Sequence, residues 1–249
     1  MASKRRKSYL EEEQDYQEII NHFQPNQPIL EKYKVELKPK SENQKILIDL
    51  IKEKEIVICS GPAGTGKTFL ACVQALRLFK TEFKYRKIVL VKSVTTLKDE
   101  EIGFLKGTME EKMEPFTYSF FHNFEKILPK SVIKNLKDSQ SIEVLPLAYI
   151  RGINLDNCIV IIDEVQNITP DNMRTIMTRI GENCKMIFLG DEGQIDLKNK
   201  RNSSLQLIME KFAEVPAIGC IRFTEEDTVR NPLIKKIEEV FRSISGPTA

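Results

Sequence analysis

The sequence lacks any hydrophobic run long enough to cross a membrane, and its N-terminus has no apolar signal-peptide segment. None of its five cysteines forms a C-x-x-C pair, which favours small core residues in a reducing compartment over a zinc site. An excess of one charge is also missing, because the net charge is only +2. Any nucleic-acid-binding surface must therefore be a local patch. We expect a soluble, cytoplasmic protein without membrane contact.

The first 40 residues differ in composition from the rest of the 249-residue chain. A basic cluster at 4–7 precedes an acidic, helix-like stretch from about 9 to 23, and Pro25, Pro28 and Pro39 then favour an extended linker. The basic cluster is typical of a solvated tail, although contact with nucleic acid or a partner is the alternative. We predict an N-terminal extension at 1–40 and a single domain at 41–249.

From residue 41 onward, short apolar runs alternate with helical patterns. The runs suit buried parallel strands and lie at 56–59, 87–91, 142–145, 158–162, 186–189 and 217–223. The helical patterns cover 43–52, 67–79, roughly 108–136, 169–180, 203–212 and 232–243. This alternation predicts an α/β fold with a parallel β-sheet and helices on both faces.

A glycine-rich loop follows the first run and matches G-x-x-x-x-G-K-[ST]. Its glycines allow successive backbone N–H groups to point at a phosphate, and the following helix directs its positive end at the same anion. Lys67 adds a positive charge near the β- and γ-phosphates, and the Thr68 hydroxyl is a ligand for Mg²⁺. The predicted nucleotide-binding residues are Gly61, Pro62, Ala63, Gly64, Thr65, Gly66, Lys67 and Thr68.

Two further strand ends supply the groups that hydrolysis needs. The run at 158–162 ends in Asp163 and Glu164, where Asp163 can hold Mg²⁺ and Glu164 can act as general base towards water. The run at 186–189 ends in Gly-Asp-x-x-Gln, and Gln194 can contact both the γ-phosphate and the attacking water. This order of motifs is that of superfamily 1 helicase cores, so we predict a P-loop NTPase fold of the RecA-like, helicase type.

With these motifs placed, the chain resembles the PhoH family of predicted ATPases. The matching segments are 61–68, 102–107, 146–152, 162–167, 190–197 and 222–233. The resemblance implies one ATP-hydrolysing core that uses ATP and Mg²⁺, assembly into a ring such as a hexamer, and a role linked to RNA or another single strand. By position it also assigns Gln44 to adenine recognition, for which an amide has the right donor and acceptor; a polar residue at a helix start is the alternative. Lys92-Ser93 stands where the family usually has Arg-Pro, which keeps the charge and loses the bidentate fork.

A single core lacks the arginine that usually stabilises charge on the γ-phosphate. We predict that a neighbouring subunit of a head-to-tail ring supplies it. Among the candidates Arg151, Arg179, Arg222 and Arg230, we favour Arg151 and Arg230, because both lie in motif segments outside apolar strands. For any one of them, a surface or structural ion pair is an equally good interpretation.

Aromatic residues gather at 116–124, where they fit a helical core better than a base-stacking surface, while Tyr149 beside Arg151 is the better pair for a substrate. Three functions remain open. The first is an ATPase working on, or stimulated by, single-stranded RNA or DNA. The second is a nucleotide-dependent protein-interaction switch, and the third is a ribonuclease linked to RNA metabolism. A small-molecule kinase is disfavoured, because kinases usually lack Gly-Asp-x-x-Gln.

Overall fold

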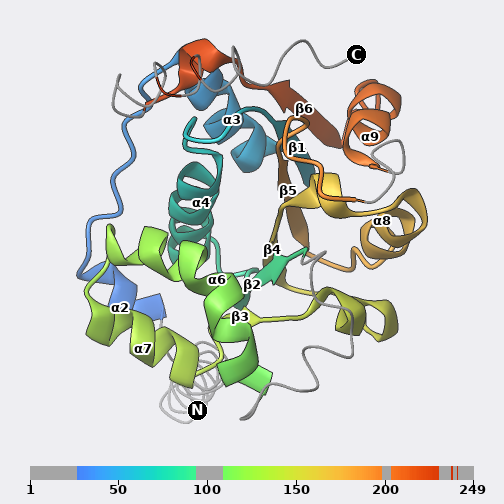
Figure 1. Ribbon diagram of the computed structural model, residues 1–249. Helices are drawn as coiled ribbons and strands as arrows, with labels where there is room; N and C mark the ends of the chain where they lie inside the picture. Colours follow the sequence, from blue (N-terminus) through green and yellow to red (C-terminus); the bar gives the residue numbers. More distant parts are fainter. Residues whose placement is uncertain (1–26, 94–108, 198–202, 230–236, 238–239, 241–249) are drawn as a thin grey trace, which may run out of the picture.

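A six-stranded, entirely parallel sheet forms the centre of the computed structural model, which describes residues 27–93, 109–197, 203–229, 237 and 240 (Figure 1). The strand order is β3-β2-β4-β5-β1-β6. The strands are β1 (Ile56–Ser60), β2 (Lys87–Lys92), β3 (Ile142–Val144), β4 (Cys158–Asp163), β5 (Lys185–Gly190) and β6 (Ile218–Arg222). All six predicted strands are confirmed. Every residue of β1, β4 and β5 is buried, which explains why these strands read as unbroken apolar runs.

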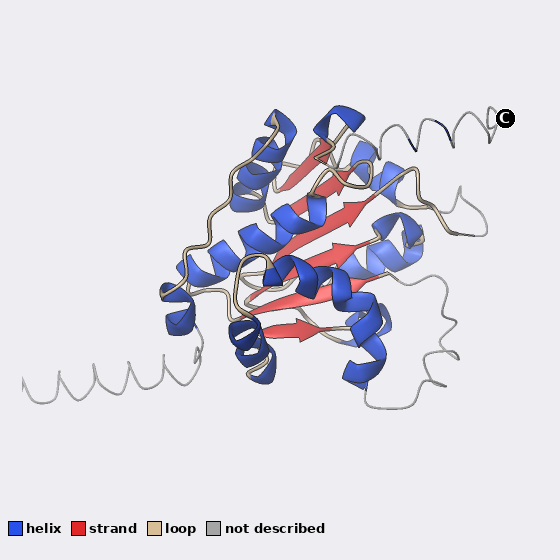
Figure 2. Ribbon diagram, turned by 60° about the vertical axis from the view of Figure 1, so that its left-hand side comes forward, coloured by secondary structure: helices blue, strands red, loops and turns tan. Residues whose placement is uncertain are grey.

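Helices cover both faces of the sheet, as predicted (Figure 2). One hydrophobic core lies between the sheet and α2 (Gln27–Glu31), α3 (Glu42–Glu53), α4 (Lys67–Thr81), α6 (Met109–Glu125) and α7 (Lys130–Asp138). The other lies beneath the 3₁₀ helices η1 (Leu147–Gly152) and η2 (Val165–Asn167), α8 (Pro170–Met177) and α9 (Leu205–Lys211). A third 3₁₀ turn, η4 (Glu225–Asp227), follows β6. None of the described helices is long and apolar enough to cross a membrane.

The helix predicted over roughly 108–136 is two helices, so that prediction is wrong in its length. Helix α6 ends at Glu125 and α7 begins at Lys130, directly after Pro129. Pro129 has an extended backbone, with ψ at +146°, so the helical geometry is interrupted immediately before α7. The helix predicted at 9–23, the motif at 102–107 and the basic cluster at 4–7 lie outside the described residues. So does the helix predicted at 232–243, apart from the isolated positions 237 and 240.

Part of the segment before residue 40 packs on the domain. Leu30 of α2 is fully buried in the core that α4 shares, and Tyr33 and Val35 pack against the same core. The domain boundary at residue 40 stays a prediction, and the packing shows that a stretch N-terminal to it contributes to the fold.

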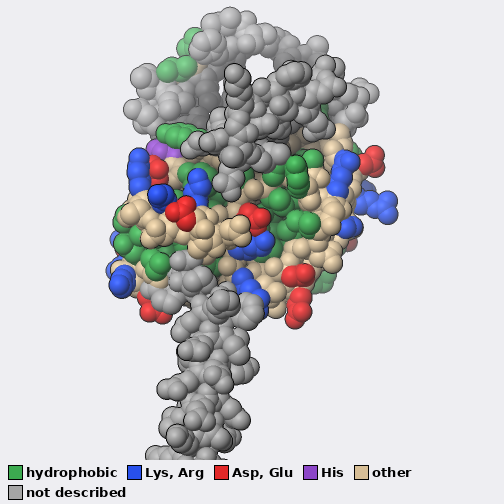
Figure 3. All heavy atoms as spheres, turned by 90° about the horizontal axis from the view of Figure 1, so that it is seen from below, with side chains coloured by type: hydrophobic (Ala, Val, Ile, Leu, Met, Phe, Trp, Pro, Cys, Tyr) green, Lys and Arg blue, Asp and Glu red, His purple; other side chains and the backbone are tan. Residues whose placement is uncertain are grey.

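Charged side chains of both signs are mixed on the face of the molecule seen in Figure 3. Lys and Arg side chains lie among Asp and Glu side chains there, and apolar side chains are visible between them. This mixing agrees with the net charge of +2 in the whole sequence. On this face, the residues that the structure describes form no extended patch of one sign.

Candidate nucleotide-binding site

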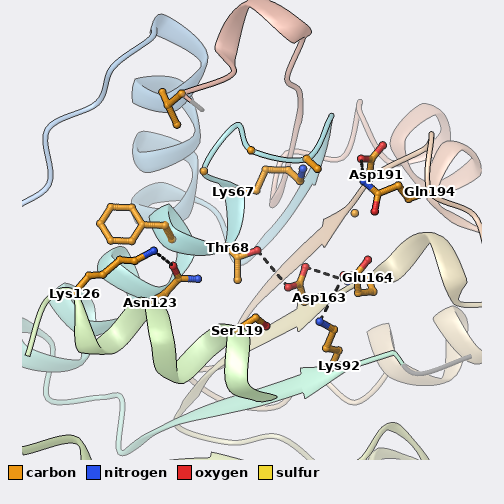
Figure 4. A pocket seen from close by; sticks show the side chains of 16 residues that line it. Lys67, Thr68, Lys92, Ser119, Asn123, Lys126, Asp163, Glu164, Asp191 and Gln194 are labelled. Atoms are coloured by element: carbon orange, nitrogen blue, oxygen red, sulfur yellow. Dashed lines mark hydrogen bonds and ion pairs between the residues drawn. The ribbon is translucent and has the colours of Figure 1, made fainter. Parts of the chain in front are cut away.

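The carboxyl ends of three neighbouring strands bring the predicted motifs to one edge of the sheet. Strand β5 lies between β1 and β4, so the loop after β5 lies between the glycine-rich loop and the Asp163–Glu164 pair. A cavity of about 600 Å³ opens at this edge (Figure 4). It is lined by Ala63, Gly64, Gly66, Lys67, Thr68, Phe69, Lys92, Ser119, Asn123, Lys126, Asp163, Glu164, Gly190, Asp191, Gln194 and Val229. The position is where ligands bind in open α/β sheets.

Glycine is required in the loop for two different reasons. Gly64 and Gly66 have φ of +84° and +88°, the left-handed region that side-chain-bearing residues rarely adopt. At Gly61 the reason is space, since a Cβ there would lie 2.5 Å from the Cβ of Phe223. Phe223 is fixed in turn by its backbone N–H, which donates to the Ser60 carbonyl at 2.8 Å. The first turn of the loop is therefore packed against the end of β6.

Lys67 begins α4 and folds its side chain back into the loop. Its Nζ donates to the carbonyls of Gly61 and Pro62, the latter at 2.8 Å. Burial lowers the pKa of Lys67, while nearby acids, including Asp163 and Glu164, oppose the shift. The ammonium thus lies where a phosphate would be cradled, next to the positive end of a 15-residue helix.

Thr68 and Asp163 form the oxygen pair that fits a magnesium ion. The Thr68 hydroxyl donates to Asp163 Oδ2 at 3.2 Å, and Asp163 is 8% exposed at the end of β4. Burial, and secondly the charge of Glu164, raises the pKa of Asp163 to about 6. A carboxylate under this electrostatic stress favours a nearby cation, and Mg²⁺ is usually held by one or two protein oxygens together with phosphates and waters.

Glu164 reaches the cavity from a strained backbone position. Its φ is +59°, in the left-handed region, which turns the chain sharply at the end of β4. One carboxylate oxygen is 3.6 Å from the Lys92 ammonium, and the other accepts a 2.8 Å hydrogen bond from Gln166. The side chain is one-third exposed, so a water at the cavity can reach it. Lys92, noted in the sequence as a departure from the family, lies in this site.

Gln194 also lines the cavity, and its amide donates to Asp191 Oδ2 at 2.9 Å. The structure adds one residue of η2 that the sequence analysis did not single out. Gln166 is completely buried and connects Glu164 to the loop containing Asp191 and Gln194. The sequence carried a signal for this role, because a glutamine in a segment next to a buried strand needs hydrogen-bond partners.

Gln44 lies beside the loop at the start of α3. Its amide donates to the Thr65 carbonyl at 2.9 Å and accepts from the Lys40 N–H at 2.7 Å. An amide has one further N–H and one further lone pair, so adenine recognition stays a prediction compatible with this placement. The same corner is fixed by Asp227, which accepts from the side chains of Ser41 and Asn43.

The candidate arginines that the structure describes bond to residues outside the cavity lining or have a buried guanidinium nitrogen. Arg151 donates to Asn172 on α8, and Arg222 pairs with Glu192 at 2.9 Å. The Nε of Arg179 is buried without a hydrogen-bond partner among the described residues, and Arg230 lies outside them. None of the three described arginines lines the cavity.

Helix α6 supplies a wall of the cavity that the sequence did not predict. Ser119 and Asn123 of this helix, and Lys126 directly after it, line the site (Figure 4). Phe120 and Phe124, the next residues after Ser119 and Asn123, are fully buried, so for these two rings the core interpretation is correct. Tyr118 is 67% exposed and stacks on His122. Tyr149, favoured for substrate contact, is exposed on η1.

The fold and the loop define the class of protein. The chain has a parallel sheet with a glycine-rich loop between β1 and α4. An acidic pair lies at the end of β4, and β5 lies between β1 and β4 in the sheet. This is the architecture of a P-loop NTPase. The site is therefore a nucleotide-binding site.

The family follows from comparison with known proteins. The family model described as "PhoH-like protein" matches residues 36–242, and the chain belongs to this family. It is 36% identical to a PhoH-like protein of Synechocystis over 205 residues, which are 82% of this chain and 62% of the relative. The PhoH-like protein of Bacillus subtilis is also 36% identical, with 82% and 64% covered. Protein PhoH of Escherichia coli is 32% identical, with 79% and 56% covered. The chain thus spans about 60% of the length of these relatives.

Solved structures resemble the fold at low sequence identity. The large terminase of a thermophilic bacteriophage matches with a TM-score of 0.51 and 14% identity, over 82% of this chain and 50% of the terminase. A second crystal form of the same terminase gives a TM-score of 0.50. These matches confirm the P-loop NTPase fold, and a likeness at this identity concerns the fold alone.

Proposed function

We propose that this protein is a Mg²⁺-dependent ATPase that acts on, or is stimulated by, single-stranded RNA or DNA. The observation that carries the hydrolytic part is the placement of Glu164 at the cavity wall, directly after the buried Asp163 and across from the glycine-rich loop. Nucleotide binding without hydrolysis would require only the glycine-rich loop. A carboxylate held between Lys92 and Gln166 at the phosphate end of the cavity is suited to activate water.

Each residue has a separate role in this proposal. Lys67 and the N-terminus of α4 bind the phosphates, and Thr68 with Asp163 holds Mg²⁺, which neutralises charge on the phosphate oxygens when bound. Glu164 takes a proton from the attacking water, and Gln194 orients that water against the γ-phosphate. Gln44 contacts adenine and so favours ATP over GTP.

Charge on the γ-phosphate is stabilised by an arginine of a neighbouring subunit. The support is that none of the described arginines lines the cavity. Arg151 on η1 and Arg230 after η4 remain the candidates, and a head-to-tail ring, a hexamer in the proposal, places one subunit's arginine at the next subunit's site. Such an arginine contributes about 10³–10⁵ in rate.

A mixing experiment tests the ring. Lys67→Ala subunits cannot bind the phosphates, and Arg151→Ala or Arg230→Ala subunits cannot supply the arginine. Combining two inactive proteins restores ATPase activity where an intact site meets an intact arginine. No recovery at any ratio, with both proteins co-assembling on a sizing column, argues against an arginine acting across the interface.

Exposed aromatic rings close in sequence to basic residues support the binding of single-stranded nucleic acid. Tyr149 lies two residues from Arg151 in the sequence, and the stacked Tyr118–His122 pair lies on α6, directly before Lys126, which lines the cavity. Bases stack on such rings irrespective of sequence, and nearby cations attract the backbone.

The test is the steady-state ATPase rate with and without single-stranded RNA or DNA, with Lys67→Ala as the blank. Stimulation of about fivefold or more that falls with rising salt supports the proposal. Slow turnover that nucleic acid leaves unchanged, combined with nucleotide-dependent capture of a protein, supports the switch instead. If the RNA in these reactions carries a label and its fragments become shorter, a ribonuclease is supported.

A further inference from the structure

Gln166 is a buried amide with polar partners on two functional segments. It lies in η2, is 0% exposed, and its Nε2 donates to Glu164 Oε2 at 2.8 Å and to the Gln194 carbonyl at 3.0 Å. Its Oε1 accepts from the Asp191 N–H at 3.1 Å. One side chain therefore contacts the proposed general base and both ends of the loop from 191 to 194.

The geometry around this amide leaves it little freedom. A Cβ at Gly190 would lie 3.1 Å from Gln166 Oε1 and 2.9 Å from Val165 Cγ2, so the absence of a side chain at 190 lets the amide approach the strand end. Only an amide carries both N–H donors and an acceptor at the end of such a side chain. A buried amide with several partners also keeps its place because leaving any of them unpaired costs free energy.

Glu164 is consequently held at both of its oxygens. Lys92 faces Oε1 from the end of β2, and Gln166 donates to Oε2. The Lys92 contact, at 3.6 Å, is longer than a direct hydrogen bond, so Gln166 makes the closer and more directional contact. A shift of the loop that carries Gln194 changes the position of this donor, and with it the orientation of the carboxylate.

The side chain of a second residue holds the chain just after this loop and does not contact the Glu164 carboxylate, although the backbone N–H of the same residue donates to the Glu164 carbonyl at 3.0 Å. Asn167 accepts from the Asp196 N–H at 2.8 Å and donates to Asp196 Oδ2 at 3.3 Å. Neighbouring side chains of η2 thus anchor the loop at two points, and only one of them reaches the base. Substituting Gln166 and Asn167 one at a time therefore distinguishes anchoring of the loop from orientation of the Glu164 carboxylate.

We propose that Gln166 is a positioning residue that makes the orientation of Glu164 depend on the position of the loop carrying Gln194. Contact between Gln194 and a γ-phosphate then aligns the base in the same movement, so that water is activated only when a triphosphate is bound. The proposal rests on the proposed ATPase function, and it assigns to Gln166 no contact with the nucleotide.

The experiment compares four variants of the full chain with the parent. Gln166→Met keeps the length of the side chain and removes all three of its hydrogen bonds. Asn167→Leu, in the same 3₁₀ turn, is the matched control, because it removes the side-chain bonds to Asp196 and none to the Glu164 carboxylate. Glu164→Gln and the double variant Glu164→Gln/Gln166→Met complete a double-mutant cycle. Thermal unfolding, ATP affinity from a fluorescent analogue, kcat and KM are measured for each. If Gln166→Met unfolds below the assay temperature, Gln166→Glu replaces it, since it keeps the acceptor and loses both donors.

We expect Gln166→Met to lower kcat at least about tenfold, with ATP affinity and KM within about threefold of the parent. Asn167→Leu should keep kcat within about threefold, and the double variant should be no slower than Glu164→Gln alone. Equal losses in Gln166→Met and Asn167→Leu, or independent losses that multiply in the double variant, would overturn the inference while leaving the ATPase assignment intact. A parent without turnover, or Glu164→Gln at the parent rate, would overturn the proposed function and this inference with it.

Discussion

Substituting Gly61 by alanine tests whether the glycine-rich loop is packed against β6 as the structure shows. The added Cβ would lie 2.5 Å from the Cβ and 2.9 Å from the carbonyl oxygen of Phe223. Carbon atoms in contact prefer about 3.5–4.0 Å, so roughly 1 Å of overlap must be relieved. Phe223 is buried and its N–H is bonded to the Ser60 carbonyl, so the backbone of the strand end would have to move.

Overpacking of this kind costs about 1–3 kcal/mol in the free energy of unfolding. For a chain of this size each kcal/mol lowers Tm by about 2–4 °C. Gly61→Ala should therefore melt roughly 2–12 °C below the parent in a calorimetric scan without nucleotide. Gly152→Ala is the control, because a Cβ at Gly152 meets nothing within 4 Å. Its Tm should lie within about 2 °C of the parent. Equal melting temperatures for the two variants would refute the packing argument.

Three other substitutions test the site and the fold. Burial raises the pKa of Asp163 to about 6, so the nucleotide-free protein loses stability as pH rises from the ordinary value of 3.8 through 6. Asp163→Asn should raise the unfolding free energy at about pH 7.5 by about 1–3 kcal/mol, and a less stable variant in urea titrations would contradict this. Desolvation raises the pKa of Asp227, but hydrogen bonds from Asn43, Ser41 and Thr224 outweigh it and lower that pKa. The contribution of the ionised Asp227 to the unfolding free energy is complete above pH 3.8 and is lost as pH falls through its lowered pKa. Asp227→Asn should therefore reduce the loss of stability in acid. An unchanged pH dependence would contradict the hydrogen bonds to Asp227. Leu30→Ala should cost about 2–5 kcal/mol in the same urea assay, whereas a cost under about 0.5 kcal/mol would show that α2 is not part of the core.

The strands could be predicted from sequence because a parallel strand buried on both faces is a continuous apolar run. Cys158–Asp163 shows this most clearly, since all six residues are buried and the acid at its end lies at the sheet edge. The order of the motifs was equally readable, because each motif sits at a strand end and parallel strands end at the same edge. The break at Pro129 was missed because the helical periodicity continues on both sides of it.

The parts of the site that depend on tertiary packing could not be predicted. Ser119 and Asn123 of α6, and Lys126 just after it, line the cavity only because α6 packs on α4 and on the neighbouring strands β2 and β3, which no local pattern encodes. Gln166 was visible as part of a motif, but its partners in the loop after β5 are 25 and 28 residues further along the chain. In the proposal the arginine comes from a second subunit, so the choice between Arg151 and Arg230 stays a prediction.

In the proposed function, Glu164 activates water at a site that binds ATP through the glycine-rich loop. Glu164→Gln separates the two steps, because it keeps the shape of the side chain and removes its basicity. Binding of ATP in the presence of Mg²⁺ and single-turnover hydrolysis, measured on the same preparation, test the claim most directly. Glu164→Gln should bind ATP within about threefold of the parent and hydrolyse it more slowly by about 10²–10⁴. Hydrolysis at the parent rate with intact binding would contradict it.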